Sequence, residues 1–456
     1  MSKPTPISGF PEWLPPQRMI EQYVIDKVRA TFELYGFAPL ETRAVEPLDQ
    51  LLRKGETSKE VYVLRRLQED AESAEPTRSG KQNATTPGDA ALGLHFDLTV
   101  PFARFVLENS GKLTFPFRRY QIQKAWRGER PQEGRYREFL QADIDVVDRD
   151  TLPFHYDTEM PLVIGDVFAA LPIPPARIQV NNRKVCEGFY RGLGLADTDQ
   201  VLRTVDKLDK IGPEKVAALL VETAGATDAQ AAACLKLASI SAEDGSFVDA
   251  VRALGVDDPL LDEGLGELLQ VVETAAEHAP GLVVAELKIA RGLDYYTGTV
   301  YETQLRGYER FGSICSGGRY DNLASSGNER YPGVGISLGL SRILGLLIGR
   351  DALGVSRSVP TCVLVALPTE ELRADCDRIA GALRRRGIAT EVAPTAAKFG
   401  KQIRFAERRG VPYVWFPGVD GARDEIKDIR SGEQLEADAA TWEPPAEDRY
   451  PVITAR

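Results

Sequence analysis

The chain has few of the residues that build covalent cross-links and metal sites, with five cysteines and three histidines among 456 residues. The cysteines are odd in number and widely scattered, and none lies in a C-x-x-C spacing or beside a pair of histidines. We therefore expect neither a disulfide framework nor a structural zinc site, and the sequence leaves the ligands of any other metal unknown.

Long apolar runs and a secretion signal are also missing. No run of about 18 uncharged apolar residues occurs, and the N-terminal MSKPTPISGFPEWLPP has neither the basic nor the apolar region of a signal peptide. We expect a cytoplasmic, globular protein that makes no membrane contact. With 43% hydrophobic residues, a chain of this length can bury a large core, and about two to four domains are expected.

Glycine-rich phosphate loops are absent as well. The sequence contains no GxxxxGK[ST] motif and no strand-like run that leads through GxGxxG into a helix. These absences argue against the P-loop and dinucleotide-binding enzymes.

Acidic residues outnumber basic ones by 67 to 56, and the net charge of -11 taken alone argues against a nucleic-acid partner. The distribution is uneven, because residues 384–409 contain only Glu391 and Glu407 as acidic residues beside many basic ones. The basic residues of this segment are Arg384, Arg385, Arg386, Lys398, Lys401, Arg404, Arg408 and Arg409. The segment fits a phosphate-facing surface or, equally well, an ordinary solvated helix face.

Changes of pattern along the chain suggest its organisation. Residues 16–36 have apolar residues at helical spacing and end at a glycine, which predicts a long amphipathic helix. The Ser-, Gly- and Pro-rich stretch 68–90 predicts an exposed loop, and strand-like segments follow at 94–147. Residues 198–278 predict several short helices, strand and glycine patterns return at 287–348, and 349–360 has the composition of a linker.

The last hundred or so residues alternate in a βαβα manner, which predicts a small α/β domain with a mainly parallel sheet. We expect four segments in all: the first part of a catalytic domain at 1–185, a helical insertion at 186–284, the second part of the catalytic domain at 285–352 and the C-terminal domain at 358–456. The overall fold class is α/β.

The most informative stretch is RRYQIQKAWRGERPQEGRYREFLQADIDVV, at 118–147, which reads as strand, loop and strand. Alternation places polar residues on one face of each strand and apolar residues on the other. The polar faces hold Arg119, Gln121, Gln123, Arg127 and Glu129 on the first strand and Gln141, Asp143 and Asp145 on the second.

Arginines are dense in this stretch, at positions 118, 119, 127, 130, 135 and 137. Guanidinium groups pair with phosphate oxygens, so arginines beside a row of carboxylates suit a site for a polyanion next to a cation. An exposed charged hairpin is the plainer alternative, but it explains poorly why Gln141, Asp143 and Asp145 align opposite a clean apolar face.

The same segment resembles motif 2 of the class II aminoacyl-tRNA synthetases, and FRxERPQxGRYREFxQxDxD is similar in particular to histidyl-tRNA synthetases, here with Trp126 in the aromatic place. The resemblance implies an antiparallel catalytic sheet flanked by helices and a C-terminal anticodon-binding domain. It also implies that Arg127 clamps the α-phosphate of ATP and the substrate carboxylate. Glu129 would meet the adenine end, Arg135 the distal phosphates, and Gln141 and Asp145 the substrate histidine.

Upstream, LHFDLTVPFAR at 94–104 is similar to the amino-acid-binding strand of the family. The resemblance implies that Asp97, Leu98 and Thr99 bind histidine, with Asp97 and Thr99 on its α-ammonium group. His95 replaces the arginine that is common in the family, and we expect it to lie outside the chemistry.

Downstream, ARGLDYYTGTVYE at 290–302 resembles a histidine-specific signature. The resemblance assigns Arg291 to the α-phosphate of ATP, as a second catalytic arginine that also contacts histidine. It assigns Tyr295 and Tyr296 to histidine binding. On a strand these two tyrosines would point to opposite sides. The second signature, SGGRYDNL, carries Gly317 and Gly318, which allow a close backbone approach that a Cβ would block.

GVGISLGLSRILGLL at 333–347 predicts a glycine-interrupted strand that runs into an apolar helix. It resembles motif 3 of the class, in which Arg342 binds the γ-phosphate of ATP, although Ser341 stands where a glutamate is common. Residues 16–47 would be motif 1, the dimer-forming element, with Ala44 in place of its usual proline.

The resemblance therefore implies a homodimeric enzyme that activates L-histidine with ATP and transfers it from histidyl-adenylate to tRNA(His). Triphosphate chemistry implies Mg²⁺. The alternative is a non-catalytic relative such as the regulatory subunit of ATP phosphoribosyltransferase, which usually lacks the C-terminal domain and the signature residues. Because Arg127, Gln141, Arg291 and Arg342 are all present, the enzyme is the favoured hypothesis.

Overall fold

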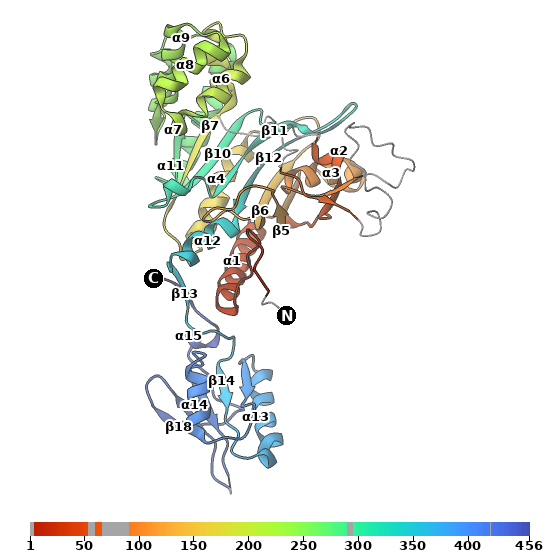
Figure 1. Ribbon diagram of the computed structural model, residues 1–456, viewed down its shortest axis with the longest axis vertical. Helices are drawn as coiled ribbons and strands as arrows, with labels where there is room; N and C mark the ends of the chain where they lie inside the picture. The colour runs from red at the N-terminus through yellow and green to blue at the C-terminus, as the bar shows by residue number, and fades with distance from the viewer. Residues whose placement is uncertain (1–3, 53–59, 66–90, 290–294, 420) are drawn as a thin grey trace. The chain divides into compact units, whose positions relative to one another are not determined.

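The computed structural model describes residues 4–52, 60–65, 91–289, 295–419 and 421–456 (Figure 1). The chain divides into two compact units. The first comprises Met1–Pro11 and Ile25–Leu346, and the second comprises Glu12–Val24 and Leu347–Arg456. The loop predicted at 68–90 and the predicted catalytic residue Arg291 lie outside the described residues.

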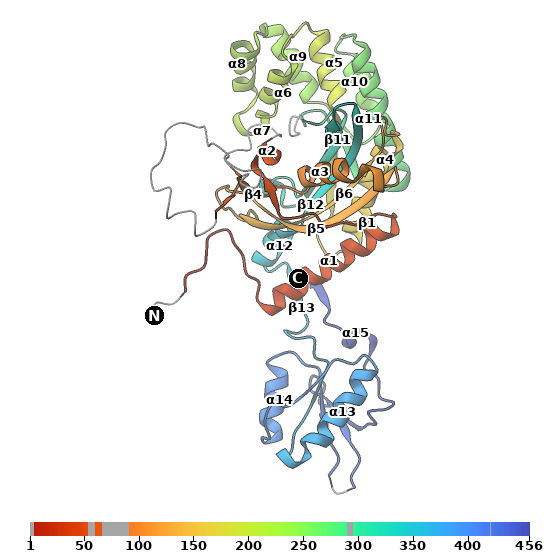
Figure 2. The same ribbon diagram turned by 90° about the vertical axis from the view of Figure 1, so that its right-hand side faces the viewer.

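A nine-stranded mixed sheet forms the centre of the first unit (Figures 1 and 2). Its strands, in spatial order, are β1 (Ala38–Pro39), β5 (Phe117–Trp126), β6 (Glu138–Val147), β12 (Glu329–Gly339), β11 (Cys315–Ser326), β10 (Thr299–Leu305), β7 (Ala176–Asn182), β9 (Val283–Glu286) and β8 (Ser241–Ala242). The six strands from β5 to β7 pair antiparallel, whereas β1 and β9 join in parallel. The predicted antiparallel catalytic sheet is confirmed for these six strands.

The predicted N-terminal helix is α1 (Pro15–Leu34), and it ends two residues before Gly36, whose φ of +75° suits a helix C-terminus. Its residues Val28 and Phe32 are fully buried, and the Phe32 ring lies 6.0 Å from that of Tyr120 on β5. The part of α1 that follows Val24 is thus fixed against the sheet.

A helix interrupts the segment that was predicted to be strand-like throughout. After β4 (Leu92–Leu94), the chain forms α3 (Thr99–Asn109), so the prediction of an extended 94–104 is wrong beyond residue 94. The Asp97 carboxylate accepts a hydrogen bond from the Val100 amide at 3.1 Å and stabilises the start of the helix. Phe102 and Val106 of α3 are fully buried against the sheet.

Two further elements complete the surroundings of the sheet. A three-stranded sheet pairs β2 (Val45–Pro47) and β3 (Val63–Leu64) with β4, beside the short α2 (Leu48–Leu51). Helix α4 (His155–Ala169) is joined to β11 by a buried ion pair, in which Arg319 lies 2.6 Å from Asp157. This pair anchors β11 immediately before Tyr320.

The helices predicted at 198–278 are confirmed. They are α6 (Thr198–Val205), α7 (Leu208–Ile211), α8 (Pro213–Ala224), α9 (Asp228–Ala238), α10 (Ser246–Arg252) and α11 (Pro259–His278), preceded by α5 (Arg183–Gly192). Figures 1 and 2 show α6, α8 and α9 gathered beyond the β7 side of the sheet. The 20-residue α11 packs on α4, α5, β7 and β9, and α5 in turn packs on α6.

The second unit contains a five-stranded sheet in the order β15 (Thr390–Val392), β14 (Val363–Val365), β16 (Tyr413–Phe416), β17 (Glu425–Asp428) and β18 (Gln434–Glu436). Its helices are α13 (Arg373–Arg385), α14 (Phe399–Glu407) and α15 (Ala446–Arg449), and β13 (Leu353–Val355) pairs with β19 (Ile453–Ala455). The alternating pattern is confirmed, but only β15, β14 and β16 are parallel. Strands β17 and β18 add antiparallel, because the connections before them are too short for a crossover.

Short 3₁₀ helices occur at Ser110–Lys112, Glu309–Phe311 and Glu370–Leu372, and α12 (Leu340–Gly349) follows β12 as predicted. All five cysteines are buried and none forms a disulfide. In the described part of the chain, every helix is too short or too polar to cross a membrane.

Candidate active site

Two adjoining cavities open over strands β6, β11 and β12 in the first unit. The larger has a volume of about 530 Å³ and the smaller about 70 Å³. Both are lined by Arg127, Gln141, Tyr296, Ser316, Gly317 and Ser337. Arg127, in the loop after β5, and Gln141 on β6 therefore line both cavities.

The polar face of β6 lines the smaller cavity. Gln141, Asp143 and Asp145 alternate along the strand as predicted, and all three are buried. Asp143 accepts a hydrogen bond from the Ser337 hydroxyl at 2.5 Å, and Asp145 accepts one from the Tyr320 hydroxyl at 2.7 Å. These partners lie on β12 and β11, so three neighbouring strands hold the carboxylates in place.

The buried guanidinium group of Arg119 partly balances these carboxylates. Arg119 on β5 is fully buried, and its Nη2 lies 2.6 Å from Asp145. Burial raises the pKa of Asp143 to about 7, although the Arg119 charge and the Ser337 hydrogen bond act in the opposite direction. Asp97 lines the smaller cavity together with Asp143 and Asp145. The lining of this cavity is therefore acidic and suits a cationic ligand.

Three tyrosines form the aromatic wall of the smaller cavity. The rings of Tyr295 and Tyr296 lie 4.5 Å apart, and Tyr320 meets Tyr295 edge-on at 6.2 Å. The prediction that Tyr295 and Tyr296 point to opposite sides is wrong, because both lie before β10 begins at Thr299 and are not on a strand. Burial raises the pKa of Tyr320 well above its ordinary value, and its hydroxyl therefore stays protonated as a donor to Asp145.

Residues 95–99 divide between the cavity and the core. Asp97 and Thr99 line the smaller cavity, whereas Leu98 is fully buried and lines neither cavity. His95 also lines neither: its ring is buried 5.5 Å from that of Trp126, and its Nε2 donates to the Lys124 carbonyl at 2.7 Å. The expectation that His95 lies outside the chemistry agrees with this packing.

Glycines on β11 and β12 make room for the site. A Cβ on Gly335 would lie 2.1 Å from the Asp145 carboxylate, and one on Gly318 would lie 3.0 Å from the Tyr296 ring. A Cβ on Gly317 would lie 2.1 Å from the Gly335 carbonyl oxygen. The predicted close approach at Gly317 and Gly318 is therefore confirmed.

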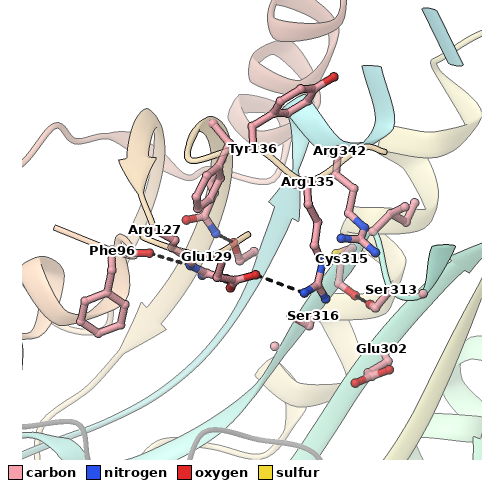
Figure 3. A pocket seen from close by; sticks show the side chains of 18 of the residues that line it. Phe96, Arg127, Glu129, Arg135, Tyr136, Glu302, Ser313, Cys315, Ser316 and Arg342 are labelled. Carbon is pink, nitrogen blue, oxygen red and sulfur yellow. Dashed lines mark hydrogen bonds and ion pairs between the residues drawn. The ribbon is translucent and has the colours of Figure 1, made fainter. Parts of the chain in front are cut away.

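The arginines that line the larger cavity come from a loop and a helix, and Glu302 lies on β10 (Figure 3). Arg127 donates to the Phe96 carbonyl at 3.0 Å, and Arg135 donates to Glu129 at 3.1 Å. Arg342 on α12 donates to the Phe311 carbonyl. Figure 3 shows the guanidinium groups of Arg135 and Arg342 extending toward the strands that carry Ser316 and Glu302.

The dense arginines of residues 118–137 do not all reach a cavity. Arg118 pairs with Glu159 at 2.9 Å, Arg119 with Asp145, and Arg137 donates to the Glu129 carbonyl at 3.1 Å. Only Arg127 and Arg135 of this group line the larger cavity. Three of the six arginines, Arg118, Arg119 and Arg137, therefore have structural partners, and the density of arginines alone does not identify the ones that line the cavity.

Residues that depart from the family patterns have structural partners. Ser341 is buried, and its hydroxyl accepts a hydrogen bond from the Leu140 amide at 2.8 Å, which joins α12 to β6. The carbonyl of Ala44 accepts from the His95 amide at 3.0 Å. Serine at 341 thus supports the strand that carries Gln141.

Several residues that line the smaller cavity had no predicted role, among them Asp143, Ser316, Tyr320 and Ser337. Alternation had placed Asp143 on the polar face with Gln141 and Asp145, but no function was assigned to it. Ser337 lies directly opposite Asp143 in the β6–β12 register, a relation between strands that no local pattern reveals.

Comparisons with known proteins agree with this geometry. A sequence model of histidyl-tRNA synthetases matches residues 81–343, and a model of an anticodon-binding domain matches residues 361–440. A histidine–tRNA ligase of Cutibacterium acnes is 59% identical over 461 residues, covering 99% of each chain. The chain belongs to the histidyl-tRNA synthetase family. The family predicted from the motifs is confirmed.

Other members of the family extend the likeness. A histidine–tRNA ligase of Micrococcus luteus is also 59% identical, with 99% of each chain covered. The crystal structure of histidyl-tRNA synthetase from Nostoc sp. PCC 7120 has a TM-score of 0.84 at 35% identity, over 96% of this chain and 97% of that one. A Bacillus halodurans structure titled as an ATP phosphoribosyltransferase regulatory subunit/histidyl-tRNA synthetase shares only the fold, at 17% identity. The predicted histidine–tRNA ligase function is confirmed over the regulatory-subunit alternative by these full-length relatives.

Proposed function

We propose that the two cavities carry out the histidine–tRNA ligase reaction, in which ATP activates L-histidine and the histidyl group passes to tRNA(His). The activity and the substrates ATP, histidine and tRNA follow from the family and its histidine–tRNA ligases. The assignment of sites rests on one observation: a small acidic cavity and a larger arginine-lined cavity adjoin at Arg127.

Histidine occupies the smaller cavity in this proposal. Its α-ammonium group and imidazole face Asp97 and Asp145, and its carboxylate faces Arg127. Thr99, Gln141, Tyr295 and Tyr296 complete the lining. Leu98 supports Asp97 and Thr99 from the core instead of contacting the ligand, because its side chain is fully buried.

ATP occupies the larger cavity, with its α-phosphate at Arg127. One carboxylate oxygen of histidine attacks the α-phosphorus, the bond to the β-phosphate oxygen breaks, and pyrophosphate leaves. Arg127 neutralises the charge that builds on the α-phosphate oxygens, and Arg291 is assigned the same role. Arg135 and Arg342 meet the distal phosphates, and Glu129 meets the adenine end. The protein contributes positioning and electrostatic stabilisation, and no covalent intermediate on the chain is required.

Mg²⁺ fits the larger cavity as a partner of the triphosphate. No described group of three or more His, Cys, Asp or Glu side chains could hold a metal ion by itself. In ATP sites Mg²⁺ is held chiefly by phosphate oxygens and water with one or two carboxylates. Glu302, which lines the cavity, would supply such a carboxylate, and the ion would neutralise phosphate charge.

The second unit is assigned to tRNA. Lys398, Lys401, Arg404 and Arg408 are exposed on or beside α14, and spaced cations of this kind suit a phosphate backbone. Other basic residues of the segment are structural, since Arg409 pairs with Glu391 at 2.7 Å and Arg386 with Glu443 at 2.6 Å. We further propose a cytoplasmic homodimer that uses residues 16–47, and domain boundaries at 1–185, 186–284, 285–352 and 358–456.

Histidine-dependent exchange of labelled pyrophosphate into ATP tests the proposal. The wild-type protein is expected to catalyse the exchange and to charge tRNA(His), and Arg291→Ala is expected to abolish both. Arg252→Ala, at a side chain that is 66% exposed on α10, is the matched control and should behave as wild type. Absence of exchange in the wild type would contradict the proposal, and exchange without charging would indicate another acyl acceptor.

A further inference from the structure

We propose that Ser337 and Asp143 are positioning residues that hold the side-chain amide of Gln141 in the one orientation that receives the α-ammonium group of histidine. This inference rests on the proposed assignment of histidine to the smaller cavity. It adds two residues to the binding machinery that act through Gln141.

The three side chains form a short relay across two paired strands. The Gln141 amide nitrogen lies 2.5 Å from the Ser337 hydroxyl oxygen, and that hydroxyl lies 2.5 Å from the Asp143 carboxylate. An ionised carboxylate only accepts, and a hydroxyl has a single hydrogen to donate. Asp143 therefore takes the hydrogen of Ser337, and the hydroxyl oxygen is left to accept from Gln141.

The relay fixes the orientation of the amide of Gln141, a residue that lines both cavities. Because its nitrogen is bound to Ser337, the carbonyl oxygen Oε1 is turned away from Ser337. This atom is buried and has no hydrogen-bond partner among the described residues. A buried acceptor without a partner is costly, and a cationic donor from the ligand would satisfy it. In the opposite orientation, the amide would present hydrogens to the ammonium group and repel it.

Asp143 is surrounded by charged and titratable groups on every side. Arg119 on β5, Asp145 on β6 and Asp97 before α3 act on it, and Asp143 in turn acts on Cys315 of β11 and Tyr296. Burial is the largest influence and raises the pKa of Asp143 to about 7. A protonated Asp143 can donate to Ser337, whose own hydrogen then points to Gln141. That arrangement favours the flipped amide, so histidine binding weakens as the pH falls below about 7.

The first experiment measures pyrophosphate exchange with histidine and ATP varied separately. Gln141→Ala tests the direct contact and Ser337→Ala tests the relay. For Ser337→Ala we expect the KM for histidine to rise about fivefold to tenfold, the size of one lost hydrogen bond, with kcat and the KM for ATP almost unchanged. Ser337→Thr, which keeps the hydroxyl, should restore most of the affinity. Ser326→Ala, at an exposed end of β11, is the matched control.

The second experiment is the pH profile of kcat/KM for histidine in the wild type and in Asp143→Asn. An asparagine oxygen accepts from Ser337 at every pH, so the variant lacks the switch. Between pH 8 and pH 6 the wild-type value should fall about tenfold relative to the variant. Because both proteins meet the same substrate, titration of free histidine cancels in the ratio.

Specific outcomes would overturn the inference. If Gln141→Ala raises the KM for histidine and Ser337→Ala, confirmed as folded by its melting curve, does not, the relay is refuted while the site assignment stands. If Ser337→Ala impairs kcat and both KM values together, the residue is structural and the inference fails. A ratio of the two pH profiles that is flat refutes the role of Asp143. If Gln141→Ala itself changes nothing, the site assignment and the inference fail together.

Discussion

The two cavities differ in where their charged side chains come from. In the smaller one, Asp143 and Asp145 project from a central strand and are bound by groups on neighbouring strands, and the Asp145 side chain is 4% exposed. In the larger one, Arg135 and Arg342 come from a loop and a helix, and the Arg135 side chain is 45% exposed. A fixed set of groups suits the selection of one amino acid, whereas partly exposed cations suit phosphates that must enter and leave.

Arg127 lies in both cavities, and its loss should have the largest effect. We expect Arg127→Ala to lower kcat/KM for pyrophosphate exchange on the order of a hundredfold or more, because a charge-stabilising donor is lost where the phosphorus reacts. The thermal midpoint should hardly change, since the side chain is 34% exposed. A loss of less than about threefold in exchange, measured beside Arg252→Ala, would place the reacting phosphate elsewhere.

A larger residue at Gly335, which packs against Asp145, should have an intermediate effect on stability and histidine binding. In Gly335→Ala the new Cβ would lie 2.1 Å from Asp145 and must displace a carboxylate that is bound to Arg119 and Tyr320. We expect a loss of about 1–3 kcal/mol in the free energy of unfolding and a higher KM for histidine, with the KM for ATP unaffected.

Gly266→Ala is the matched control, because its Cβ on α11 would have no neighbour within 4 Å. Alanine there should raise the free energy of unfolding by up to about 1 kcal/mol. Denaturant unfolding measures both variants. If Gly335→Ala and Gly266→Ala have equal free energies of unfolding, the groups that line the smaller cavity are not held in fixed positions.

Removing an exposed arginine of the larger cavity should have the smallest effect. We expect Arg135→Ala to raise the KM for ATP about threefold to fivefold, because a solvent-screened charge contributes little, and the effect should shrink as salt is added. Arg130→Ala, in the same loop but lining neither cavity, serves as the control. If the rise in the KM for ATP in Arg135→Ala does not change with salt, Arg135 does not contact the phosphates as a solvent-exposed charge.

Alternation in the sequence predicted the part of the site that lies on one strand. Gln141 and Asp145 share a face of β6, and that face lines the smaller cavity. Regular strands transmit their pattern directly to the surface they form. The family resemblance was needed to name histidine, because a row of carboxylates would accept other cations equally well.

Helix α3 was missed because its composition resembles a strand. Thr99, Val100 and Phe102 favour extended structure, but they follow an aspartate that binds the helix start. Pro101 falls in the first turn, where a missing N–H does no harm. Asp97 and Pro101 together were the available signal for a helix start.

The arginines show what local patterns cannot supply. Arg118 and Arg119 are adjacent, yet one pairs with Glu159 on α4 and the other is buried against Asp145. Which arginine receives a structural partner depends on residues far away in the sequence. Density of charge therefore predicted the region of the site, and the fold decided which members serve it.

The glycines of β11 and β12 limit how this enzyme could be redesigned. Gly318, Gly333 and Gly335 lie beneath Tyr296, Tyr320 and Asp145, each occupying the least volume that an amino acid allows. No substitution at these positions can enlarge the smaller cavity. An engineer who wants the protein to accept a bulkier amino acid must shorten the tyrosines themselves, at the expense of the Tyr320 hydrogen bond to Asp145. Variants that accept smaller substrates should be the easier ones to obtain.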